Sequence, residues 1–194
     1  MKRWLKFALV SPLFVAAAAL GPKDLASGPA IGSEAPAFDP QHVTGPDKGS
    51  HTCPMCKYGF LTGALIWVNT EDLATVAPIA ARLERAITEK GAAHVRAFVI
   101  YMNPTGAPAK EVESRLAAFA REAALSQVAV AYVPGPTDGK TSALYAINPD
   151  PRVKNTVLVY RKRRVRDKFI NLGSDGASLE RLMTSLEKVA SEPG

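Results

Sequence analysis

The residues with the clearest capacity for chemistry lie in one short stretch of the sequence, His51 to Gly59 (HTCPMCKYG). It contains Cys53 and Cys56, the two cysteines of the chain, which are separated by two residues. This spacing suits one intramolecular disulfide or half of a soft-metal site. Because so small a ring constrains the unfolded chain little, chemistry or local loop shape explains such a pair better than global stability does.

Three interpretations of the pair remain open. In the first it is a redox dithiol, in which Cys53 attacks or is attacked and Cys56 resolves the mixed disulfide. Lys57 or His51 then stabilises the thiolate by its charge. In the second it belongs to a copper or zinc site, because imidazole, thiolate and thioether donors lie close together; the candidate ligands are His51, Cys53, Met55 and Cys56. In the third, the pair only shapes a loop of a non-catalytic interaction protein.

The first twenty residues have the layout of a secretory signal. Lys2, Arg3 and Lys6 form a positive segment, and an apolar run of 14 residues, Phe7 to Leu20, follows it. The run is short for a membrane span, so we expect cleavage and a periplasmic or secreted protein. A retained N-terminal membrane anchor is the alternative. Export would allow the cysteine pair to stay oxidised.

Composition indicates one globular domain with little evidence for an anionic partner. The chain has 194 residues, of which 47% are hydrophobic and 22% charged. The formal charge of +6 falls to +3 when the three basic residues of the signal are removed. A basic run, Arg161 to Arg164, lacks interleaved aromatic residues. We therefore expect a solvated hairpin tip that protects an edge strand, and no nucleic acid partner.

The elements that must position the cysteine pair alternate between strand and helix patterns. Dense apolar runs predict buried strands, and apolar residues at helical spacing predict helices. The strands are expected over Ala64–Asn69, Val95–Met102 and Val128–Val133, and the helices from Thr70 to Gly91, over Ala109–Leu125 and over Ser178–Ala190. Pro78 predicts a kink or a late start of the first helix. A short element at Ser142–Ile147 and a hairpin of Thr156–Tyr160 with Val165–Asn171 complete the chain.

Two sequence segments, together with this order of elements, resemble the redoxin and peroxiredoxin-like group, which comprises the alkyl hydroperoxide reductase and thiol-specific antioxidant proteins. Ile31 to Phe38 (IGSEAPAF) is similar to the V-G-x-x-A-P-x-F opening of redoxins. Asn155–Tyr160, followed by Val165–Phe169, resembles their late hairpin. The resemblance implies an α/β fold, a thioredoxin-like three-layer sandwich with a mixed central sheet flanked by helices. It covers about Ile31 to Ala190.

The usual redox site of that group is missing from its usual place. In thioredoxins the Cys-x-x-Cys motif follows the first buried strand and opens the next helix, and peroxiredoxins carry a cysteine there. This chain has Asn69 to Asp72 at that place, and Asn155 where a cis-proline is expected. Cys53 and Cys56 instead precede the strand, in a stretch with no helix evident. The activity of that group therefore cannot be assigned to this chain residue by residue.

The sequence thus predicts an exported thioredoxin-like protein whose candidate activity is thiol-disulfide exchange. The catalytic candidates are Cys53 and Cys56, no cofactor is expected, and the partners are protein thiols or disulfides. A copper- or zinc-binding protein, or a non-catalytic interaction protein on the same scaffold, is the alternative. The expected division is a signal peptide over 1–20, a linker over 21–30 and the domain over 31–192.

Overall fold

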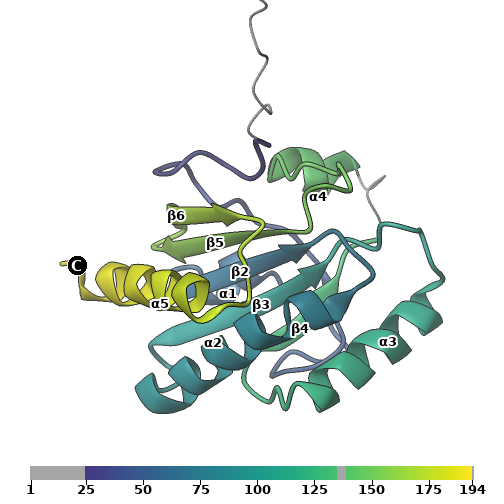
Figure 1. Cartoon of the computed structure of the whole chain (residues 1–194), viewed down its shortest axis with the longest axis horizontal. Helices are drawn as coiled ribbons and strands as arrows, with labels where there is room; N and C mark the ends of the chain where they lie inside the picture. Colours follow the sequence, from purple (N-terminus) through teal and green to yellow (C-terminus); the bar gives the residue numbers. More distant parts are fainter. Residues whose placement is uncertain (1–24, 135–138, 194) are drawn as a thin grey trace, which may run out of the picture.

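A six-stranded mixed sheet forms the centre of the protein in a computed structural model that describes residues 25–134 and 139–193 (Figure 1). The strand order is β1-β4-β3-β2-β5-β6. β4, β3 and β2 run parallel, whereas β1, β5 and β6 pair antiparallel with their neighbours. The strands are β1 Gln41–His42, β2 Thr62–Val68, β3 Val95–Tyr101, β4 Ala129–Tyr132, β5 Asn155–Arg161 and β6 Arg164–Ile170. The predicted mixed sheet is confirmed.

The central strand β2 is buried along its whole length because both faces of the sheet are covered. All seven of its residues are buried, and its sequence, TGALIWV, shows no polar alternation. Leu65 pairs with Phe98 of β3 on one side and with Leu158 of β5 on the other. The sheet is therefore the middle layer of a three-layer α/β sandwich, as predicted.

Three amphipathic helices cover one face of the sheet, in front of it in Figure 1. They are α2 Ala77–Lys90, α3 Ala109–Glu122 and α5 Gly176–Ser191. Their inner sides carry apolar residues three and four positions apart, among them Ile79, Leu83, Leu116 and Leu186, all fully buried. These side chains pack against one face of β2, β3 and β5 and form the larger of two apolar clusters.

A buried carboxylate joins α2 to the start of β4. The Glu84 residue is 8% exposed. Its carboxylate accepts hydrogen bonds from the Ser126 hydroxyl at 2.6 Å and from the amides of Gln127 and Val128 at 2.9 and 2.8 Å. Burial by itself raises the pKa of the Glu84 carboxyl, but these hydrogen bonds outweigh burial and the pKa lies below its usual value. Glu84 thus supplies acceptors for backbone amides that precede β4 and form no hydrogen bonds within the sheet.

The opposite face is covered by shorter pieces of chain. They are the helix α1 (Pro54–Tyr58), the extended segment before it, and the residues that follow α4 (Gly139–Leu144). At the centre of this second cluster Trp67 is fully buried, with its ring centroid 5.2 Å from Phe38 and 4.7 Å from Tyr145. The Tyr145 hydroxyl donates to the Pro36 carbonyl at 2.7 Å, which ties the extended segment to this cluster.

The helix predicted to begin at Thr70 begins later in the structure. Asp72, not Thr70, caps a 3-10 turn over Leu73–Thr75, and α2 then starts at Ala77. Pro78 lies in the first turn, where its missing amide is not needed. The predicted late start is therefore confirmed, as is the end of the helix at Gly91. β1 was not predicted, because a two-residue strand carries no periodic pattern.

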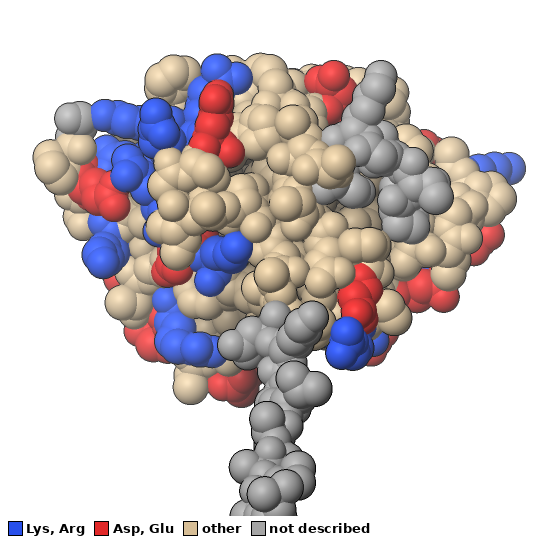
Figure 2. Space-filling model, turned by 90° about the horizontal axis from the view of Figure 1, so that it is seen from above, with Lys and Arg blue, Asp and Glu red and all other residues tan. Residues whose placement is uncertain are grey.

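The predicted hairpin is formed by β5 and β6, and Lys162 and Arg163 make its two-residue turn. Both have left-handed backbone angles, with φ of 49° and 59°, as a tight hairpin turn of this type requires. Lys162 and Arg164 are exposed, whereas Arg161 donates to the carbonyl of Val189 at the end of α5 at 2.9 Å. Figure 2 shows Lys and Arg side chains gathered at the left end of the face it presents, the end at which Figure 1 places this turn.

Several of the described residues before residue 31 contact the domain. The Ser27 hydroxyl lies 2.7 Å from that of Thr156, and the Gly28 amide donates to the Ala146 carbonyl at 2.9 Å. The predicted signal peptide, 1–20, and residues 21–24 of the predicted linker lie outside the described residues, so the division of the chain stays a prediction. No helix within the described ranges has the length and apolarity to cross a membrane.

Candidate functional site

Cys53 and Cys56 are joined by a disulfide at the beginning of α1, with their Cα atoms 5.2 Å apart. Cys53 caps the helix, since its Sγ accepts a hydrogen bond from the amide of Cys56 at 3.0 Å. Pro54 occupies the first turn, where proline is favoured. The expectation that no helix stands behind the pair was wrong. A helix of five residues is too short to show periodicity, and its signal in the sequence is the proline that follows the capping residue.

The inner side of α1 is fixed to the second cluster. Met55 is fully buried and Tyr58 is 8% exposed. The ring of Tyr58 lies 5.8 Å from that of Phe98, and the Arg96 guanidinium lies 4.7 Å from the same Tyr58 ring. At the end of the helix a Cβ on Gly59 would collide with the backbone carbonyl oxygen of Met55 and would lie 2.8 Å from Arg163 Cγ of the hairpin turn, so this position favours glycine. The disulfide therefore rests on a well-packed base.

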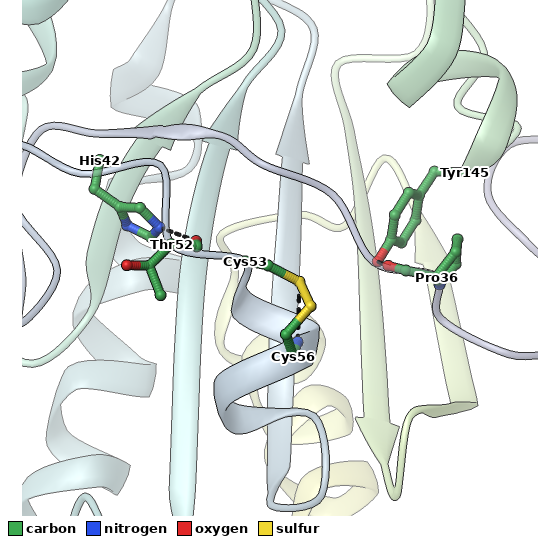
Figure 3. Close-up of a disulfide and its surroundings, with 6 residues drawn as sticks. All are labelled: Pro36, His42, Thr52, Cys53, Cys56 and Tyr145. Atoms are coloured by element: carbon green, nitrogen blue, oxygen red, sulfur yellow. Dashed lines mark hydrogen bonds between the residues drawn. A yellow bond between two sulfur atoms is a disulfide. The ribbon is translucent and has the colours of Figure 1, made fainter.

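The segment that leads into Cys53 is held by a buried histidine. His42 of β1 is 1% exposed, and its Nε2 lies 2.8 Å from the Thr52 carbonyl oxygen. A ring nitrogen can contact a carbonyl in this way only as the donor, so Nε2 carries the proton. The Thr52 hydroxyl also lies 2.8 Å from that of Ser50. Figure 3 shows the result: the two sulfur atoms lie in front of the sheet, between His42 and Thr52 on one side and Pro36 and Tyr145 on the other.

A second buried group anchors the last two residues of α1. The Asp47 carboxylate accepts from Lys57 Nζ at 2.5 Å and from the Tyr58 hydroxyl at 2.8 Å, and its side chain is 6% exposed. Burial acts to raise the pKa of Asp47, but the hydrogen bonds from Lys57 and Tyr58 outweigh it, so the pKa lies below its usual value. The same contact raises the pKa of Lys57. The positive charge beside Cys56 is thus partly neutralised.

We expect Asp47→Ala to lower the free energy of unfolding by about 2 kcal/mol at pH 7, because the buried Tyr58 hydroxyl loses its acceptor. Since the folded pKa of Asp47 is lowered, its contribution is complete above the unfolded value of about 3.9 and is lost as the pH falls through the folded value. Urea unfolding at pH 7 and in the acid range measures both effects. Asp39→Ala, at an exposed acid of the same segment, is the control. Equal losses in the two variants would contradict this role of Asp47.

Comparisons with known proteins give matches at the level of structure. No protein-family model matches the sequence, and no curated protein matches it. Among solved structures, a putative thiol:disulfide interchange protein DsbE from Chlorobium tepidum superposes with a TM-score of 0.61 at 15% identity, over 84% of this chain and 99% of that one. A putative protein disulfide isomerase from Bacteroides thetaiotaomicron gives 0.63 at 15% identity, over 87% and 96%. Peroxidoxin BcpB from Mycobacterium tuberculosis gives 0.59 at 15% identity, over 82% and 97%.

The chain has the thioredoxin fold. The predicted resemblance to thioredoxin-fold redoxins is thereby confirmed, and identities this low show the fold alone. The order of strands and helices and the late hairpin, from which the resemblance was inferred, are those of the structure.

In this thioredoxin-like domain an ionic network stands at the place where the fold usually carries its cysteines. The Glu71 carboxylate, just after β2, accepts from Arg115 of α3 at 2.9 Å and from the Thr105 hydroxyl at 3.2 Å. Arg115 also donates to the Tyr101 hydroxyl at 3.1 Å. The Arg115 hydrogen bond lowers the pKa of Glu71, which keeps the carboxylate charged. Nothing in this network is a nucleophile of the thiol type.

The place of the usual cis-proline in the thioredoxin fold is also used differently. Asn155 stands there, and its side-chain amide exchanges two hydrogen bonds with the backbone of Leu172, at 2.9 and 3.1 Å. The described residues contain no cis peptide bond. The cysteine pair itself lies on α1, which precedes β2 in the chain. The structure thus brings the two cysteines together on the face of the sheet opposite α2, the helix that follows β2.

The four candidate metal ligands occupy different surroundings. His51 and Cys56 are exposed, Cys53 is half-buried, and the Met55 side chain is enclosed in the second cluster. The thiolates would become donors only after reduction of the disulfide. Within residues 25–134 and 139–193 no three His, Cys, Asp or Glu side chains gather as a metal site. Copper or zinc binding stays a prediction.

Two residues that hold the site, His42 and Asp47, were not found by sequence reasoning. Both come from the Gly- and Pro-rich lead-in, which has no periodicity, and both reach residues ten or more positions away in the sequence. The turn at Gly45–Gly49 was the available signal, because it brings the chain back beside β1.

Proposed function

We propose that this protein is an exported thiol-disulfide oxidoreductase that exchanges its Cys53–Cys56 disulfide with protein thiols. The observation that carries the proposal is a disulfide at the protein surface, with Cys56 exposed, on a rigidly packed helix of a thioredoxin-like domain. Exchange requires a sulfur atom that another thiolate can reach. Cys56 meets this requirement.

The size of the ring also favours a chemical role. By the chain-entropy relation, a ring of four residues stabilises the fold by about 2 kcal/mol, against about 4.7 kcal/mol for a loop of a hundred residues. α1 is in addition held by contacts that do not use sulfur, those of Met55, Tyr58 and Lys57. A disulfide that is accessible and adds little to stability is of the labile, exchanging kind.

Partners and location follow from the same proposal. The similar structures include one described as a putative thiol:disulfide interchange protein and one described as a putative protein disulfide isomerase, which supports protein thiols as the partners. The signal-like sequence of residues 1–20 supports export to a compartment where disulfides persist.

The proposal is tested by the reduction of insulin with dithiothreitol as the electron donor, followed by the turbidity of the released chains. We expect the wild-type protein to accelerate the reaction, and Cys53→Ser and Cys56→Ser each to abolish the acceleration, because either change removes the disulfide. Near-ultraviolet circular dichroism of each variant verifies that the domain is folded.

Thr70→Ala provides the matched control at the usual place of the thioredoxin-fold site, after β2. This variant is expected to keep the wild-type rate. If the wild type and Cys53→Ser show equal, negligible rates, the protein is not an oxidoreductase of this kind. If Thr70→Ala loses the rate and the cysteine variants keep it, the reaction takes place at the end of β2 and the proposal is wrong.

A further inference from the structure

The two cysteines of the disulfide have unequal surroundings. Cys53 is half-buried and packs against the second apolar cluster, whereas Cys56 is exposed. The geometry of α1 explains the difference. Met55 and Tyr58, three residues apart, define its inner side, and Cys56 and Lys57 between them turn outward to solvent. A partner that approaches from solvent therefore meets Cys56 first.

The hydrogen bonding also distinguishes the two sulfur atoms. Cys53 Sγ accepts the amide hydrogen of Cys56 at 3.0 Å. A hydrogen bond to a thiolate stabilises the charged form, and a more stable thiolate is the better leaving group in exchange. The carbonyl before Cys53 is also fixed by His42. Cys53 is thus suited to be the leaving group when the disulfide is attacked, and its position in the protein is fixed.

We infer that Cys56, and not Cys53, is the cysteine that forms the mixed disulfide with the partner. This inference rests on the proposed function and reverses the roles that the sequence suggested, in which Cys56 only resolves. Access to Cys56 and the stability of the Cys53 thiolate as a leaving group both favour attack on Cys56 of the oxidised protein.

Exchange with a partner dithiol takes place in two steps, each of which forms one disulfide bond and breaks another. A thiolate of a partner dithiol forms a bond to Cys56 Sγ, the bond between the two cysteines breaks, and the electron pair stays on Cys53 Sγ, where the Cys56 amide stabilises it. The second thiolate of the partner then attacks the partner sulfur in the mixed disulfide, and Cys56 leaves as a thiolate. The partner dithiol is oxidised to a disulfide, and the protein disulfide is reduced to two thiols. In the opposite direction reduced Cys56 attacks a partner disulfide, and Cys53 resolves it.

The test uses the oxidised full chain and reduced glutathione as the probe. After a short reaction at pH 7, N-ethylmaleimide blocks every free thiol, and peptide mass spectrometry locates the glutathione and the maleimide. We expect glutathione on Cys56 with maleimide on Cys53, in excess over the opposite pattern by about tenfold or more. Cys53→Ser and Cys56→Ser, each loaded with glutathione, provide the reference peptides.

The outcomes separate this inference from the function on which it rests. Glutathione chiefly on Cys53, or equally on both, overturns the assignment of Cys56, while insulin reduction by the wild type leaves the oxidoreductase intact. If neither cysteine takes up glutathione and insulin is not reduced, the proposed function fails and the assignment fails with it.

Discussion

Replacement of Trp67 by alanine is expected to lower the free energy of unfolding by about 4 kcal/mol. Trp67 is fully buried in the middle of β2, and its ring lies against those of Phe38 and Tyr145. Removal of the indole loses its transfer free energy and leaves a cavity that neighbouring strands cannot close. The loss should appear in urea unfolding at neutral pH as a lower midpoint with an unchanged slope.

Phe60→Ala is the matched control, because Phe60 is a large aromatic residue near the same strand that is 70% exposed. A change of less than about 0.5 kcal/mol is expected there. Similar losses for Trp67→Ala and Phe60→Ala would show that the second face of the sheet is not packed as described. In that case the base on which α1 and its disulfide rest would be in doubt as well.

Replacement of Glu84 by alanine is expected to lower the free energy of unfolding by about 3 kcal/mol at pH 7. The change leaves the amides of Gln127 and Val128 and the Ser126 hydroxyl without their acceptor in a buried place. Because the folded pKa of Glu84 is lowered, its contribution is present above the unfolded value of about 4.3 and is lost as the pH falls through the folded value. Thermal unfolding at pH 7 and pH 3 measures both effects.

Glu89→Ala tests whether the position matters, since Glu89 is an exposed acid on the same helix. Its expected change is within about 0.5 kcal/mol and does not depend on pH in this way. If Glu84→Ala matched Glu89→Ala at both pH values, the buried acceptor would have no part in joining α2 to β4. Glu84→Gln, which keeps one oxygen acceptor but not the charge, should fall between the alanine variant and the wild type.

Much of the fold could be predicted because its long elements carry strong patterns. The run Ala64–Asn69 is apolar throughout because β2 is covered on both faces, and α2 shows helical spacing because only one side of it is buried. The hairpin could be read from two β-rich runs around a basic tip. The helix expected to begin at Thr70 begins later, because the Asp72 carboxylate accepts a hydrogen bond from the amide of Ala74 and caps the 3-10 turn that precedes α2.

The candidate site was only partly predictable, for physical reasons that differ from residue to residue. The disulfide needed only the spacing of Cys53 and Cys56. The helix that carries it is five residues long and gains its stability from tertiary contacts of Met55 and Tyr58, which no local pattern encodes. The anchors His42 and Asp47 come from irregular chain, and their partners are chosen by the folded geometry alone.

The main contacts that secure α1 are made by Met55, Tyr58 and Lys57, and they do not involve the bond between the two sulfur atoms. Neither the aromatic packing of Tyr58 nor the hydrogen bonds of Asp47 passes through a sulfur atom. We therefore expect α1 to keep its packing when the disulfide is reduced and when it forms again. A partner that binds at Cys53 and Cys56 can then distinguish the oxidised protein from the reduced one. For a partner that binds elsewhere, we expect the surface to be the same in both states.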